Sequence, residues 1–194
     1  MRKYDNVLMV SFAAILLGGC GLTTERIPIA YVSGNSAVQL RGADGVHLRV
    51  DVSDLRANPD ELSKKGDEYD ILAPILAAND VAEVLKQAIA IELARSGFVV
   101  DTSGVVVQVE LSKFYNRFLG SKSVAELFMH VQVRDSNGGL RFSTLVGGNG
   151  VKSGIGLRSG DNAKEALDAA MKDAVHKLIT DIRFTDALIS AGKR

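Results

Sequence analysis

The sequence predicts an α+β protein, a two-layer sandwich in which a mostly antiparallel sheet of about four strands carries two main helices on one face. Three observations support this fold class. Several segments alternate apolar and polar residues, which is typical of half-buried strands. Two longer segments carry apolar residues at helical spacing behind a capping motif. The order along the chain is strand, helix, three strands, helix, which suits helices packed on one face of a sheet.

The strands are predicted from strict alternation. The first is clearest, because Val46, Leu48, Val50 and Val52 alternate with polar residues. Asn137-Gly138, the strongest short hairpin signal, separates the last two strands. We expect the first strand–helix–strand unit to form one parallel pair and the other strands to pair antiparallel. The alternating segments are 46–53, 105–112, 124–134 and 140–146.

Two helices are predicted from their capping boxes and apolar stripes. Asp80 and Glu83 form the first box, and the helix that follows ends near Gly97. Asn162 and Glu165 form the second box, ahead of an apolar stripe that continues to residue 182. A short helical tail is expected at 185–191.

The remaining segments are predicted as connections. Residues 147–160 are rich in glycine and indicate a flexible loop between the last strand and the second main helix. Residues 54–79 read mainly as loop, with a short strand at 69–72. Residues 27–32 could be extended at a sheet edge, because Pro28 tolerates only edge or first-strand positions.

Composition excludes several classes of function. The chain has 194 residues, with 23 basic and 23 acidic side chains. This balance argues against nucleic-acid binding, which requires an excess of Lys and Arg. One cysteine excludes an intramolecular disulfide and, with three histidines, leaves few ligands for a structural zinc site.

The first twenty residues have the layout of an export signal. Arg2 and Lys3 precede an apolar run at 7–17, and Gly18, Gly19 and Cys20 follow. The run is too short to span a membrane, which requires roughly 20 apolar residues. We therefore predict a signal peptide at 1–19.

The segment Leu17-Gly18-Gly19-Cys20 resembles the lipobox of bacterial lipoproteins. The resemblance implies cleavage before Cys20, lipidation of its sulfur and acylation of its new amino group. Multiple acyl chains hold a protein stably on a membrane. Because Gly21 replaces the Asp that often retains lipoproteins at the inner membrane, the resemblance implies an outer-membrane location facing the periplasm. We then expect a lipidated tether at 20–45 and a single periplasmic domain at 46–194.

No catalytic or cofactor motif stands out. A metal site built from His47, His130 and Glu126 is conceivable, but no close ligand spacing supports it, and a solvated sheet face is the favoured interpretation. The glycines of 154–160 lack the spacing of phosphate-binding loops. We therefore expect neither a cofactor nor a metal.

One candidate partner-binding patch involves Phe114, Tyr115, Arg117 and Phe118. The apolar parity of strand 105–112 reverses at Phe114, which indicates a bulge or a strand end. Exposed here, the aromatic rings would suit a protein partner or a sugar polymer. Core packing of the same rings is the commoner outcome, because aromatic side chains usually bury their large area.

The Cys20 lipobox, the strand at 46–56, the helix ending at 93–98, the strand at 105–115 and the helix at 162–182 together resemble the YajG-type family of lipoproteins from Gram-negative bacteria. That resemblance implies an outer-membrane lipoprotein facing the periplasm, without an established reaction. We expect a non-enzymatic binding or assembly module for a periplasmic protein or peptidoglycan. An accessory lipoprotein of an envelope transport system is the alternative, and an enzyme is the least supported hypothesis.

Overall fold

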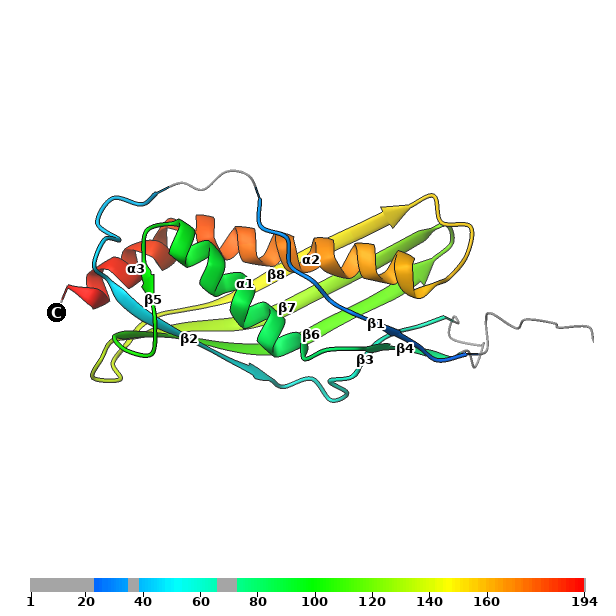
Figure 1. Cartoon of the computed structure of the whole chain (residues 1–194), viewed down its shortest axis with the longest axis horizontal. Helices are drawn as coiled ribbons and strands as arrows, with labels where there is room; N and C mark the ends of the chain where they lie inside the picture. Colours follow the sequence, from blue (N-terminus) through cyan, green and yellow to red (C-terminus); the bar gives the residue numbers. More distant parts are fainter. Residues whose placement is uncertain (1–22, 35–38, 66–72, 194) are drawn as a thin grey trace, which may run out of the picture.

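The structure is a computed structural model that describes residues 23–34, 39–65 and 73–193. The predicted signal peptide, Cys20 and the strand expected at 69–72 lie outside these residues. The elements, drawn in Figure 1, are β1 (Glu25–Ile27), β2 (His47–Asp54), β3 (Glu61–Lys64), β4 (Pro74–Ala77), α1 (Val81–Arg95), β5 (Val99–Val100), β6 (Val105–Leu119), β7 (Lys122–Arg134), β8 (Leu140–Ser153), α2 (Gly160–Thr180) and α3 (Ile182–Gly192).

The main sheet has five strands in the order β5-β2-β6-β7-β8, so it is larger than the predicted four. The added strand, β5, has only two residues, too few to show alternation in sequence. β2 pairs parallel with β5 and β6, while β6, β7 and β8 pair antiparallel. The β2–α1–β6 unit therefore forms the expected parallel pair. A second sheet has the order β1-β4-β3 and was not predicted.

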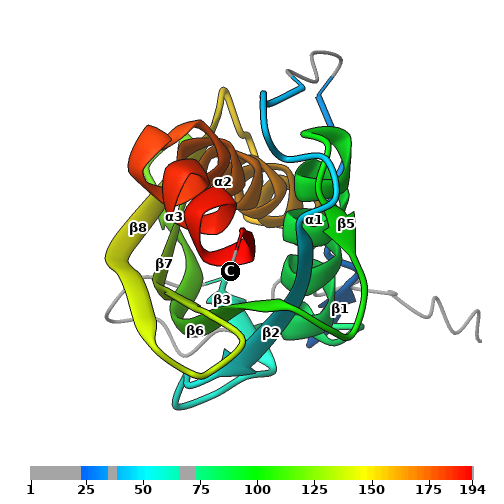
Figure 2. The same cartoon turned by 90° about the vertical axis from the view of Figure 1, so that its left-hand side faces the viewer.

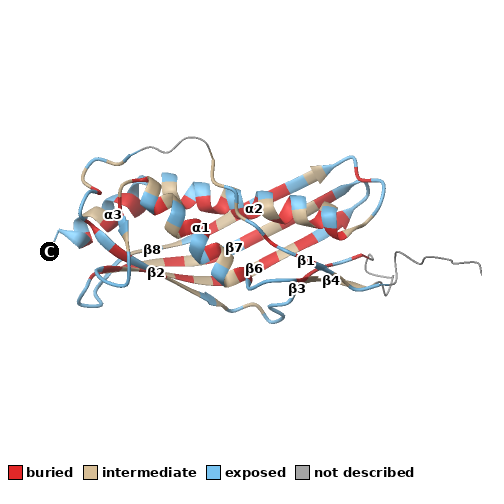
Figure 3. Cartoon of the chain, in the orientation of Figure 1, coloured by how far each residue is buried: buried red, intermediate tan, exposed pale blue. Residues whose placement is uncertain are grey.

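The helices lie on the concave face of the main sheet, which curls around α2 (Figure 2). Alternate β7 residues are fully buried on this face, as are the residues of the α2 stripe that point to them (Figure 3). The predicted α+β packing of helices on one sheet face is thus confirmed. The fully buried residues of β7 are Ser123, Ala125, Leu127, Met129, Val131 and Val133.

Helix capping follows the prediction at α1 and differs at α2. The Asp80 carboxylate accepts a hydrogen bond from the Glu83 amide at 3.1 Å, as predicted. α2 begins earlier than expected, because its N-cap is Ser159, whose hydroxyl accepts from the Asn162 amide at 3.4 Å. Asn162 therefore lies inside the first turn.

The glycine-rich segment predicted as a loop from residue 147 is the second half of β8, which continues to Ser153. Gly148 and Gly150 face α2, and a Cβ atom there would lie 2.1 Å from the Ala170 carbonyl oxygen and 1.9 Å from that of Ala166, respectively. These glycines therefore allow the helix backbone to rest directly on the strand.

Residues 23–34, expected within a tether, lie against the domain. β1 pairs parallel with β4, and Ile27 and Ile29 are buried. The Asn79 side chain bonds both the amide and the carbonyl of Ile29, each at 2.9 Å. Two apolar side chains and a paired backbone thus hold this segment in place. Among the described residues, no helix has the length and apolar character that crossing a membrane requires.

Candidate functional site

The predicted aromatic patch does not form at the surface. A register shift between Leu111 and Lys113 confirms the expected bulge, and it turns Phe114 and Phe118 toward the interior, where both are buried. Of the two interpretations of these rings, core packing is therefore correct.

The polar members of the patch bond to neighbouring strands. Tyr115 is half-buried and donates to a Glu61 carboxylate oxygen at 3.3 Å. Burial and this carboxylate raise the pKa of Tyr115 to about 12. Arg117 is exposed and pairs with Glu126 at 3.3 Å.

The three residues of the conceivable metal site are held in separate pairs. His47 contacts Asp101 at 2.5 Å, and hydrogen bonds from His47 and Ser103 lower the pKa of Asp101 to about 2. His130 contacts Glu110, while Glu126 accepts from Lys113 at 2.7 Å. Over the described ranges, no three metal-ligating side chains gather at one point.

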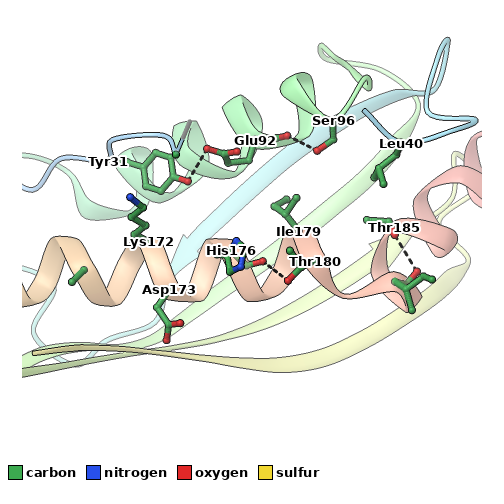
Figure 4. Close-up of a pocket in the computed structure, with 13 residues that line it drawn as sticks. Tyr31, Leu40, Glu92, Ser96, Lys172, Asp173, His176, Ile179, Thr180 and Thr185 are labelled. Carbon is green, nitrogen blue, oxygen red and sulfur yellow. Dashed lines mark hydrogen bonds between the residues drawn. The ribbon is translucent and has the colours of Figure 1, made fainter. Parts of the chain in front are cut away.

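The structure instead presents a groove of about 800 Å³ between α1 and α2. The surface of its lining is mainly apolar, and it comes from α1, α2, the first turn of α3 and residues 31, 34 and 40, which precede β2 (Figure 4). The volume lies in the range of small-molecule sites, which are mostly apolar with a few polar groups. The lining includes Tyr31, Leu40, Glu92, Lys172, His176 and Ile179.

The apolar part of the groove arises where α2 ends. Ile179 is only partly buried, and Ile182, the first residue of α3, is 71% exposed. The predicted apolar stripe of α2 included both residues, yet neither is fully buried. Leu40 lines the groove from the opposite side. Apolar side chains are thus left facing a hollow between the two helices.

The acidic groups of the groove are already bonded. Tyr31 donates to Glu92 at 2.8 Å, and burial together with this carboxylate raises the pKa of Tyr31 well above its ordinary value. Burial raises the pKa of Asp173, but hydrogen bonds from Lys177 and the Asn149 amide outweigh it, so the pKa lies below its ordinary value. Both carboxylates therefore already accept hydrogen bonds from neighbouring residues.

The basic groups of the groove differ from the acidic ones. Lys172 and His176 lie one helical turn apart on α2, both exposed, and in Figure 4 Lys172 extends toward Tyr31. Within the part of the chain that the structure describes, neither side chain forms an ion pair. The groove thus combines an aliphatic lining with basic groups that are available at its rim.

Sequence reasoning missed this groove for a physical reason. Tyr31 and Leu40 fall in the segment expected as a tether, and no motif links them to α2. The one available signal was the apolar stripe of α2, which includes two residues, Ile179 and Ile182, that the core does not fully bury. A second hollow, of about 630 Å³, is lined mainly by polar groups that include Asp54 and Arg56, which pair with each other.

Comparisons with known proteins agree with this architecture. A protein from Xanthomonas campestris in the family DUF330 has a TM-score of 0.56 at 15% identity, covering 87% of this chain and 96% of that one. A minor lipoprotein from Acinetobacter baumannii has a TM-score of 0.45 at 9% identity, covering 73% and 94% of the two chains. The first likeness shows that the fold recurs. Among curated proteins no match was found.

The family comparison covers most of the chain. Residues 35–188 match the model of a family described as "uncharacterized lipoprotein". This match supports the expected membership of a bacterial lipoprotein family. The match is independent of the lipobox, because the lipobox precedes residue 35. The chain therefore belongs to the family of bacterial lipoproteins that carries this description.

Proposed function

We propose that this protein is a non-enzymatic binding module anchored in the outer membrane through lipid on Cys20 and facing the periplasm. Its ligand is an amphiphile with an apolar chain and an anionic head, held in the groove between α1 and α2. The groove of about 800 Å³, with its aliphatic lining and basic rim, is the observation that carries the proposal.

The ligand class follows from the chemistry of the lining. Leu40, Ile179 and Ile182 offer aliphatic surface that gains free energy when an apolar chain displaces water. Lys172 and His176 offer donors to an anionic head, whereas the carboxylates of Glu92 and Asp173 are bonded to neighbouring residues. A peptidoglycan strand fits less well, because a sugar polymer needs many hydrogen-bonding partners and aromatic platforms. Among the described residues of the lining, Tyr31 is the one phenylalanine, tyrosine or tryptophan.

Binding can be tested with a photoreactive palmitate that carries a diazirine in its chain. We use the Cys20→Ser chain, which has no lipid of its own, and locate adducts by mass spectrometry. Adducts are expected on peptides of α2 and on the peptide that contains Leu40. Ile179→Asp should abolish labelling, because a bound acyl chain would remove the new carboxylate from water without giving it a partner. Ile91→Asp is the matched control, since Ile91 is exposed on α1 and does not line the groove.

Recognition of the ligand's anionic head by Lys172 is tested separately. Lys172→Glu should weaken palmitate binding about tenfold, the effect of losing one charge-assisted hydrogen bond. Lys86→Glu makes the same charge change on α1 outside the groove and should leave binding unchanged. Unaltered labelling in Ile179→Asp, or saturable binding of a muropeptide in place of palmitate, would refute the proposed ligand class.

The anchor is tested separately. Cys20 is the only cysteine of the chain, so Cys20→Ser should abolish incorporation of radiolabelled fatty acid and release the protein from the outer-membrane fraction. A Cys20→Ser chain that still fractionates with the outer membrane would contradict lipid anchoring.

A further inference from the structure

The first described residues, Thr23 to Glu25, are bonded to the body of the domain. The Lys65 ammonium donates to the Thr23 carbonyl at 2.9 Å and pairs with Glu25 at 2.5 Å. Glu25 also accepts from the Gly160 amide at the start of α2. Cys20 precedes Thr23 by three residues, which span at most about 11 Å when extended. A lipid on Cys20 therefore places this end of the domain beside the membrane.

Two loops lie at the same end of the molecule. Residues 154–159 connect β8 to α2, and the turn at Gly120 and Ser121 connects β6 to β7. The Ile155 amide donates to the Ser121 carbonyl at 3.0 Å, and the Arg158 guanidinium donates to the Lys65 carbonyl at 3.3 Å. In Figure 1 both loops lie at the right-hand end, and α3 lies at the opposite end.

The surface of these loops has the composition of a membrane-binding face. Leu119 is 55% exposed and Leu157 is 64% exposed.

Lys122 is exposed and, among the described residues, has no ion pair. On the strands that lead to this turn, Arg117 and Lys113 share the carboxylate of Glu126, which leaves one positive charge in excess among these three side chains. Asp161 is the exposed acidic residue nearby on α2, and Lys152 neutralises Glu165. Exposed leucines beside basic side chains suit the boundary between lipid head groups and acyl chains.

We propose that this end of the domain docks on the phospholipid surface that carries the anchor, with Leu119 and Leu157 inserted among the lipids. The proposal rests on the lipid anchor of the proposed function, and it adds a fixed orientation. The fixed position of Thr23 keeps the two leucines within reach of the bilayer, and α3 then lies on the far side of the domain. The short tether makes the contact intramolecular in effect, so weak insertion by two leucines suffices.

Because the chain contains no tryptophan, single tryptophans report on the contact. The lipidated full chain is reconstituted in vesicles of phosphatidylethanolamine and phosphatidylglycerol that include bromine-labelled phospholipid. The tryptophans of Leu119→Trp and Leu157→Trp should each emit at a shorter wavelength than tryptophan in a peptide dissolved in detergent-free buffer. Bromine-labelled lipid should quench at least half of their fluorescence. Leu140→Trp is the matched control, because Leu140 is 52% exposed and starts β8 at the opposite end of the sheet. Its fluorescence should be unaffected by bromine.

The outcomes separate the docking from the anchor. Vesicle flotation of the unsubstituted chain is measured first, and a chain that does not float refutes the anchor and the docking together. A chain that floats, with Leu119→Trp and Leu157→Trp both unquenched, refutes the docking alone. Quenching of Leu140→Trp in preference to the other two would show that the opposite end faces the lipid and would also overturn the proposal. The two reporter positions lie in different loops, so misfolding of one variant leaves the other informative.

Discussion

Gly150→Ala is expected to lower the free energy of unfolding by about 3 kcal/mol, at the upper end of what overpacking a core usually costs. The added methyl carbon would lie 1.9 Å from the Ala166 carbonyl oxygen and 2.6 Å from the Ala170 amide nitrogen. Both atoms belong to the backbone of α2, so no side chain can rotate away to make room. Either the helix must lift from β8 or the strand must bend. The loss corresponds to a fall in Tm of roughly 6–12 °C for a chain of this size.

The control is Gly156→Ala, which lies in the loop between β8 and α2 with no atom within 4 Å of the new methyl carbon. Replacing glycine where space and backbone allow it usually stabilises by about 0.4–1 kcal/mol, because the unfolded chain loses freedom. The two substitutions therefore should have opposite signs in urea unfolding followed by circular dichroism. Equal stability of Gly150→Ala and the unsubstituted chain would contradict the close packing of α2 on β8.

These glycines illustrate how far the sequence specifies the fold. Periodicity predicted β2, β6, β7 and the two main helices, because each buries one face and thus repeats a pattern. The bulge in β6 was also predicted, since a change of parity at Phe114 has few other physical causes. Glycine in a loop and glycine beneath a helix look alike in sequence. Only the position of α2 distinguishes them, and that position depends on tertiary packing.

The segments at 23–34 and 54–79 were harder to predict for a related reason. β1, β3 and β4 have three or four residues each, too few for alternation to be recognised. The pairing of β1 with β4 joins residues about fifty positions apart, such as Arg26 and Leu76. The groove shares this difficulty, since the Tyr31–Glu92 hydrogen bond joins residues 61 positions apart. Local patterns predict elements, whereas this site arises from contacts between distant ones.

Arg56→Met is expected to lower the free energy of unfolding by about 3 kcal/mol, the lower end of the cost of removing one member of a buried ion pair, because the pair is largely but not fully buried. The Arg56 and Asp54 side chains are only 6% and 16% exposed, and their closest atoms are 2.6 Å apart. The guanidinium also donates to the carbonyls of Pro59 and Phe114. Methionine keeps most of the volume but removes the guanidinium donors, so among the described residues the Asp54 carboxylate keeps only the backbone amide of residue 56 as a donor.

The same strand supplies a matched control. Arg49 and Asp51 form a pair at 2.9 Å with the same spacing of two residues, but both side chains are close to half exposed. Arg49→Met should change stability by no more than about 0.5 kcal/mol, because water already solvates both charges. Comparison of the two variants by urea unfolding thus separates the effect of burial on the free energy of unfolding from the effect of removing a charge. A small effect in both would mean that Arg56 is solvated in solution and does not hold the 55–60 loop against the bulge of β6. The 55–60 loop connects the main sheet to the small one. A large loss of stability in Arg56→Met alone would show that the Arg56–Asp54 ion pair holds this loop in place, and that the pair does so because it is shielded from water.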